Sequence, residues 1–243
     1  MRVALCLHGL VGNIVGKSGD SNMGSDVVLK IAHQHWDRFF ISPYNCDVFI
    51  HSWNVDLKSD MNKLFNPKNI ITEEQRKFNI PEWIPGEPQR KQNHYSKWYS
   101  NQKSVELMSQ YERDNKINYD LAIIGRFDIA WRKGIDLDSL NGKTFYIGGW
   151  MRNPANKIKD FWFISSPKNI RKFSTIFNYI EEYSSPKINA VSKSNGISNH
   201  KLVAHHLEVL GLKKEQLLKC EDDTDWEKSD YPLVRYYYYG AKK

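Results

Sequence analysis

The sequence is poor in the residues that build disulfide frameworks and zinc sites. Its 243 residues include only three cysteines, Cys6, Cys46 and Cys220, which lie far apart in the chain. This spacing fits no metal motif or disulfide framework, so it predicts a reducing compartment. No apolar run approaches the roughly 18 residues that a membrane-spanning helix needs. A strand is expected at the start of the chain with no signal peptide, which favours a cytoplasmic protein, in the host cytoplasm if it is viral.

Several catalytic signatures are also missing. The chain contains no nucleophile elbow, no Cys/His pair and no EF-hand loop, which argues against several hydrolase classes. His200 and His205 are not four residues apart, and no glutamate lies between them as in the zinc motif H-E-x-x-H. Zinc hydrolysis is therefore not predicted.

The net charge gives the first indication of what the protein binds. The formal net charge is +7, with 40% hydrophobic and 26% charged residues, which is typical of a globular chain. A cationic excess favours phosphorylated or polyanionic ligands in general. Because the lysines are scattered and form no dense basic block, nucleic acid is not the preferred partner.

Apolar runs and helical periodicities alternate along the chain. This alternation predicts one α/β domain over residues 1–243, GT-A-like or Rossmann-like, with a mostly parallel central sheet and helices on both faces. Residues 55–94 are expected to form an irregular insertion or lid with a short helix near Glu73, and residues 212–243 a C-terminal extension. Strands are predicted at about 3–7, 47–52, 119–124, 145–148 and 161–165, and helices at about 25–40, 96–113, 170–180 and 203–210.

A glycine-rich loop follows the first predicted strand. The stretch from Gly12 to Ser18 resembles a phosphate-binding P-loop but is one residue short of that motif, because Val11 stands where the first glycine would be. Ligands of open parallel sheets bind beyond the carboxyl ends of the strands. His8, Gly9, Gly12 and Lys17 are therefore candidates to line a nucleotide pocket, where glycine allows close backbone approach.

The strand that runs into Arg126 and Asp128 is the central candidate. Its apolar residues carry Asp128 to the carboxyl edge of the sheet, where a carboxylate can hold Mg²⁺ or Mn²⁺. Arg126 lies two residues earlier and shares a face with Asp128, so a purely structural ion pair is the alternative. The literal Asp-x-Asp triplets Asp136–Asp138 and Asp223–Asp225 are interpreted as solvated loops.

Two further candidates lie later in the chain. Asp160 precedes an apolar strand and is either a general base toward an acceptor hydroxyl or a carboxylate in a polar turn. His200, in the first turn of a predicted helix, is either a metal or phosphate ligand or a structural histidine. Ser198 or Asn199 would cap that helix.

These segments, in this order, resemble a group of small viral and bacterial glycosyltransferase-like proteins that build surface polysaccharides. The matching segments are residues 2–9, 47–53, 96–100, 119–128, 160–166 and 198–200. The resemblance implies a GT-A-like fold in which a nucleotide-sugar diphosphate and a divalent metal meet at a carboxylate ending a central strand. It aligns that position with Asp128, with one aspartate in place of two, and makes the segment from Asp160 an acceptor-side strand.

The sequence therefore predicts a glycosyltransferase that moves a sugar from a nucleotide-sugar donor to a glycan acceptor hydroxyl. Asp128 would bind the metal or the donor, Arg126 would offset phosphate charge, and Asp160 would be the base if the reaction inverts. Two alternatives stay open. One is a P-loop-like kinase or sulfotransferase using Lys17 and Ser18, and the other is a non-catalytic nucleotide-sugar or glycan binding protein.

Overall fold

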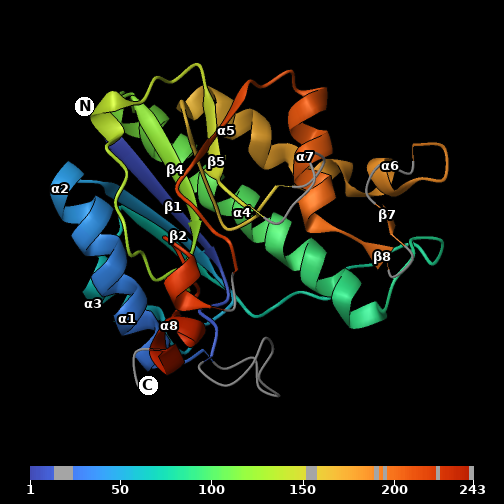
Figure 1. The fold of residues 1–243 in the computed structure, drawn as a ribbon, viewed down its shortest axis with the longest axis horizontal. Coiled ribbons are helices and arrows are strands. Elements are labelled where there is room, and N and C mark those ends of the chain that lie inside the picture. Colours follow the sequence, from blue (N-terminus) through green and yellow to red (C-terminus); the bar gives the residue numbers. More distant parts are fainter. Residues whose placement is uncertain (14–23, 152–157, 189–191, 194–195, 223–224, 241–243) are drawn as a thin grey trace.

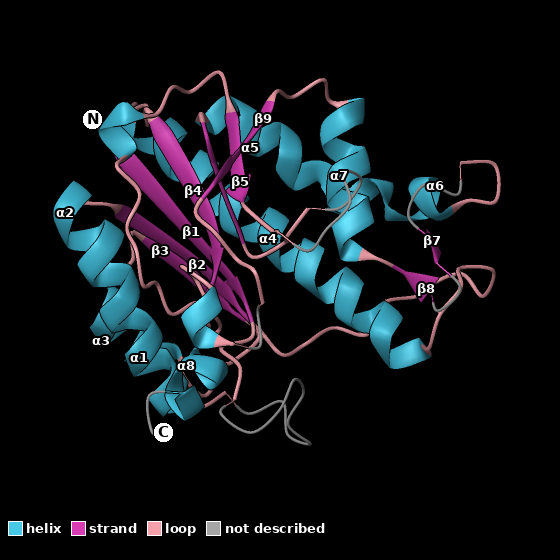
Figure 2. Ribbon diagram, in the orientation of Figure 1, coloured by secondary structure: helices cyan, strands magenta, loops and turns pink. Residues whose placement is uncertain are grey.

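The protein is a layered α/β structure built around a twisted central sheet (Figures 1 and 2). The computed structural model describes all residues except 14–23, 152–157, 189–191, 194–195, 223–224 and 241–243. Among the described residues, seven strands form the sheet in the order β3-β2-β1-β4-β6-β5-β9. Their bounds are β1 Val3–Gly9, β2 Asp47–Ser52, β3 Asn69–Thr72, β4 Leu121–Arg126, β5 Phe145–Gly148, β6 Trp162–Ser165 and β9 Lys214–Leu217; a separate hairpin pairs β7 Ser192–Lys193 with β8 Gly196–Ile197.

The mostly parallel sheet that the sequence predicts is confirmed, with one exception. Strands β1, β2, β3 and β4 pair in parallel, and β5 pairs in parallel with β9. Strand β6 is antiparallel to both β4 and β5. A continuous apolar run fixes a buried strand but carries no information on its direction, so the sequence could not show this reversal.

Helices cover both faces of the sheet, as predicted. In Figure 1, α1, α2, α3 and α8 lie on one side and α4, α5, α6 and α7 on the other. The α-helices are α1 Asp26–Trp36, α2 Ser42–Tyr44, α3 Lys58–Phe65, α4 Pro88–Asn115, α5 Pro167–Ser174, α6 Ile180–Ser184, α7 Asn199–Val209 and α8 Val234–Gly240. A π-helical segment follows α1 at Asp37–Ile41, and short 3₁₀ helices lie at Leu137–Ser139, Thr175–Tyr179 and Trp226–Lys228.

The alternation of side chains along β1 divides the core into two clusters. Val3, Leu5 and Leu7 pack on the α1 and α3 side, whereas Ala4 and Cys6 pack on the α4, α5 and α7 side. Successive strand residues point to opposite faces, so a strand buried on both faces reads as a continuous apolar run. On the α1 side a Cβ atom at Gly125 would lie 2.5 Å from the ring of Trp36, so only glycine fits there.

The two segments expected to be least regular carry sheet strands. Residues 55–94 contain α3, β3 and the first turns of α4, and no helix forms near Glu73. Residues 212–243 contain β9 and a segment that bonds to the chain after β4: Ala130 N–H donates to Pro232 O at 2.8 Å, and Val234 N–H donates to Asp128 O at 2.8 Å. Both β3 and β9 are edge strands, which bury few side chains and so leave a weak apolar signal.

Candidate functional site

The candidate site is at the carboxyl edge of the parallel strands, on the face covered by α4. Strand β1 pairs so that His8 lies opposite His51 of β2 and Arg126 of β4. Because alternate residues share a face and Cys6 packs on the α4 side, these three side chains project toward α4. The register therefore places two histidines and a guanidinium side by side at the edge where ligands of open sheets bind.

Arg126 and Asp128 form a two-point ion pair. Arg126 Nε donates to Asp128 Oδ1 at 2.8 Å, and its second amino group donates to Oδ2 at 2.7 Å. The Asp128 side chain is 7% exposed and that of Arg126 is 28% exposed. The guanidinium also lies 5.0 Å from the ring centre of Phe161. Such a paired, stacked guanidinium is held in one orientation, with part of its surface left accessible.

Asp160 is buried between two basic side chains. Lys97 of α4 donates to Asp160 Oδ2 and, at 2.6 Å, to Asp160 O. On its other side His200 Nδ1 lies 3.4 Å from Oδ1. Burial would raise the pKa of Asp160, but the charges of Lys97 and His200 outweigh it, so this pKa lies below its ordinary value. Asp160 is therefore a carboxylate throughout the neutral range.

The charges near Lys97 join the two ion pairs into one set. Burial lowers the pKa of Lys97, Asp160 raises it, Arg126 lowers it and Asp128 raises it. The same field acts on His8, whose pKa is lowered first by burial and then by Lys97 and Arg126. His8 is therefore neutral, and its buried Nδ1 has no hydrogen-bond partner among the described residues. Residues from β1, α4, β4 and the segment just before β6 thus form a single electrostatic cluster.

A chain of buried hydrogen bonds fixes the end of β1. Gly9 N–H donates to Ser100 Oγ at 2.7 Å, and Ser100 Oγ lies 2.7 Å from His51 Nδ1. His51 Nε2 in turn lies 3.1 Å from Glu73 Oε1. Gly9 has a φ of 96°, a left-handed value that favours glycine. Ser100 and His51 are completely buried, so they position the strand end rather than contact a ligand.

The glycine loop approaches Asp128 from β1. Gly12 has a φ of 88°, and a Cβ atom there would lie 3.6 Å from Asp128 Oδ2. Gly12 O accepts a hydrogen bond from Ser25 N–H, the N-cap of α1, at 3.0 Å. Gly12 thus brings backbone close to the central carboxylate, and its role in lining a nucleotide pocket stays a prediction. Lys17 and Ser18 lie outside the described residues, so the P-loop alternative stays a prediction.

The two predicted metal ligands, Asp128 and His200, each contact other protein groups. Both oxygens of Asp128 bond to Arg126, while His200 Nδ1 lies 3.0 Å from Ile158 O and its ring packs 4.6 Å from that of Trp150. Within the part of the chain that the structure describes, no three His, Cys, Asp or Glu side chains are grouped to hold a metal ion. His200 is accordingly a partner of Asp160 here, and Mn²⁺ or Mg²⁺ remains an expectation of the resemblance.

The described aspartates of the Asp-x-Asp triplets, Asp136, Asp138 and Asp225, lie at short 3₁₀ turns. Asp136 caps the 3₁₀ turn at Leu137–Ser139, and Asp138 is exposed. Asp225 caps the turn at Trp226–Lys228, and Asp223 lies outside the described residues. Those carboxylates that are described serve local capping or face solvent.

Sequence reasoning missed Lys97, Ser100 and His51 as members of the cluster. A signal was present for the first two, because Lys97, Ser100 and Ser104 repeat at helical spacing among apolar residues of α4. Polar side chains on a buried helix face need hydrogen-bond or ion-pair partners, so this pattern indicates a buried polar cluster. The partners themselves are far away in the chain: 63 residues separate Lys97 from Asp160, and 91 separate Ser100 from Gly9.

Comparison with known proteins leaves the chain without an assigned family. Its sequence matches no protein-family model and is significantly similar to no curated protein. Among the described residues, no helix combines the length and apolar character needed to cross a membrane. The function therefore has to be argued from the site alone.

Proposed function

We propose that the protein transfers a sugar from a nucleotide-sugar donor to a hydroxyl group of a glycan acceptor, on a GT-A-like fold. The observation that supports this best is the cluster at the carboxyl edge. It combines two cations, Arg126 and Lys97, with two carboxylates, Asp128 and Asp160. Transfer from a nucleotide sugar needs cations for the departing diphosphate and a carboxylate near the acceptor.

The cations would hold the donor diphosphate. A guanidinium offers several donors in a plane and binds phosphate at two points, and an ammonium adds a mobile charge. Arg126 is 28% exposed while bound to Asp128, so part of it can face a ligand. His8, Gly9 and Gly12 border the same edge and would line the nucleotide, with the glycines allowing close approach.

Asp160 would accept the proton of the acceptor hydroxyl if the configuration inverts. In that step the hydroxyl oxygen bonds to the anomeric carbon, its proton passes to Asp160, and the bond to the diphosphate breaks. Lys97 holds the pKa of Asp160 low in the free protein. A bound diphosphate would attract the Lys97 ammonium and so make Asp160 more basic when the donor is present.

Asp128 would orient the donor by fixing Arg126, or by binding the ribose. Hard divalent cations bind one or two protein carboxylates together with substrate phosphates. If Mn²⁺ or Mg²⁺ takes part, Asp128 would hold it together with the diphosphate, and the ion would offset the negative charge of the leaving group. No step of the proposal depends on it.

Donor binding and transfer test the proposal with UDP-, GDP-, CMP- and dTDP-sugars, each with and without Mn²⁺. A donor present at 100 times its Kd should raise the melting temperature by about 5–10 °C, because it binds only the folded chain. Asp160→Asn should keep this shift and lower transfer by roughly 100-fold or more. Asp128→Asn should weaken the shift itself.

Asp138→Asn is the matched control, because Asp138 is exposed and belongs to a literal Asp-x-Asp triplet away from the cluster. It should bind donor and transfer sugar as the unaltered chain does. If Asp128→Asn leaves both donor binding and transfer unchanged, the central assignment is wrong. Donor binding without hydrolysis or transfer across the whole panel would favour the non-catalytic alternative.

A further inference from the structure

A second charged region lies at the opposite edge of the sheet, where β1 and β4 begin. A hollow of about 380 Å³ there is lined by Arg113 and Lys116 at the end of α4 and by Arg171 of α5. Glu112 is the carboxylate in this lining, and its Oε2 accepts from Arg171 at 2.6 Å. The hollow therefore carries more positive than negative charge.

A second hollow, of about 820 Å³, lies on the other side of the start of α5. It is lined by Lys143, Lys168 and Lys213, together with uncharged residues. All three lysines are exposed, and in the described part of the chain none of them has a carboxylate within 4.0 Å. Three ammonium groups around one hollow repel each other unless an anion lies among them.

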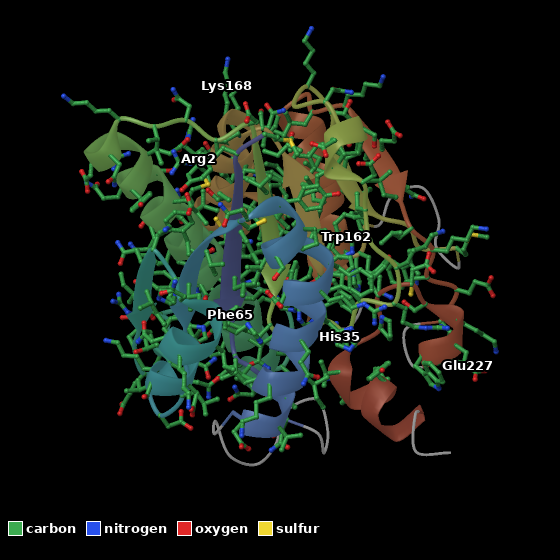
Figure 3. All side chains as sticks on the ribbon, turned by 90° about the vertical axis from the view of Figure 1, so that its left-hand side faces the viewer. Arg2, His35, Phe65, Trp162, Lys168 and Glu227 are labelled. Carbon is green, nitrogen blue, oxygen red and sulfur yellow. The ribbon has the colours of Figure 1, made fainter. Side chains whose placement is uncertain are left out.

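The two hollows belong to one surface. Lys168 and Arg171 are one turn apart on α5, and each lines one hollow. Figure 3 shows Lys168 projecting from the same end of the molecule as Arg2, which precedes β1. We call this surface the cationic edge, formed by Arg113, Lys116, Lys143, Lys168, Arg171 and Lys213. Glu112 is the carboxylate among the lining residues of the two hollows. The carboxylate of the nearby Asp120 accepts a hydrogen bond from the backbone N–H of Arg2 at 2.6 Å.

We propose that the cationic edge docks on a lipid bilayer containing anionic phospholipids. An anionic bilayer attracts clustered lysines and arginines, and each charge near the surface multiplies the affinity about fivefold. The cations lie on flexible side chains around open hollows, which suits many mobile headgroups better than one rigid ligand. Neither lining contains an aromatic residue on which a nucleic-acid base could stack.

This docking leaves the candidate site accessible. The cationic edge is at the amino ends of the parallel strands, and Arg126, Asp128 and Asp160 are at the carboxyl ends. A bilayer at one edge would therefore leave the other edge facing water. Docking on a bilayer does not require sugar transfer, so binding to anionic vesicles tests it independently of the proposed function.

Sedimentation with two kinds of vesicle tests this docking. One kind contains phosphatidylcholine alone, and the other contains about 30% phosphatidylglycerol, which gives its surface a negative potential like that of an anionic leaflet. The unaltered chain should sediment with the anionic vesicles only, and should be released as salt is raised toward about 1 M. The triple variant K143E/K168E/K213E changes the charge by six units and should lose affinity by roughly 10⁴-fold. The neutral variant K143Q/K168Q/K213Q removes three charges and should lose roughly 100-fold.

The matched control is K58E/K77E/K187E, which makes the same change in net charge at exposed lysines outside the cationic edge. It should bind far better than the edge variant. Equal binding of the unaltered chain to both kinds of vesicle, or equal loss in the edge and control variants, would overturn the proposal. So would edge-dependent binding to single-stranded RNA or duplex DNA with no binding to anionic vesicles, which would make this a nucleic-acid surface.

Discussion

The pair formed by Lys97 and Asp160 should couple stability, charge and the candidate chemistry. Lys97→Met removes the ammonium and leaves Asp160, whose side chain is 7% exposed, without the cation that bonds to its carboxylate. Removing one member of a buried ion pair typically costs about 3–5 kcal/mol in the free energy of unfolding. Asp160→Asn, which leaves the ammonium unpaired beside Arg126, should cost a similar amount.

The double variant should cost much less than the sum of the two single variants. With both charges removed, no unpaired charge remains buried, so a loss of about 3 kcal/mol is expected instead of the sum of the two single losses, about 6–10 kcal/mol. Urea unfolding at pH 7 and 25 °C, followed by circular dichroism, measures all four chains. The resulting coupling energy of at least about 3 kcal/mol is well above the error of such a cycle.

The effect of Lys97→Met on stability should depend on pH in a definite direction. In the unaltered chain the pKa of Asp160 lies below its ordinary value of 3.8, so its contribution is present above pH 3.8 and is lost as the pH falls below it. In Lys97→Met, burial should raise this pKa, and a raised carboxyl pKa stabilises the protonated form. The stability difference between the two chains should therefore shrink from pH 7 to pH 4. Two results would refute the reasoning. One is that each single variant loses less than about 1 kcal/mol of unfolding free energy and the two losses add up in the double variant. The other is that the stability difference between Lys97→Met and the unaltered chain does not change with pH.

Two further predictions concern buried polar groups. Ser100→Ala leaves Gly9 N–H and a His51 ring nitrogen without their partner, so it should lower the free energy of unfolding by about 2 kcal/mol in a urea titration. The control is Ser109→Ala, because the Ser109 hydroxyl donates to Val105 O one turn back in the same helix, and its removal should change the free energy of unfolding little. Burial lowers the pKa of His206 from 6.5 to about 4, so its neutral form is favoured in the folded chain, and stability should fall by about 3 kcal/mol as the pH drops from 7 to 4. His206→Gln should remove that part of the acid loss, and an unchanged pH profile would show that His206 does not cause it.

The sequence determined the elements whose signals are local. The runs 47–52 and 145–148 form strands at those bounds because an apolar run buried on both faces needs no information from elsewhere. The same logic placed Arg126 and Asp128 at the carboxyl edge, where Arg126 ends β4 and Asp128 follows it, and their ion pair is local, two residues apart. The helix expected at 96–113 is real but begins at Pro88, because Glu87 caps it and the polar first turns carry no apolar period.

Tertiary structure decided the partners and directions. The reversal of β6 brings Asp160 to the carboxyl edge, where Lys97 of α4 and His200 of α7 meet it from positions 63 and 40 residues away. The cationic edge is likewise invisible in the sequence, since its six cations are spread over residues 113–213 and meet only where α4, β5, α5 and β9 begin or end. Periodicity reports which face of an element is buried, whereas pairing and charge clustering depend on how the chain returns through space.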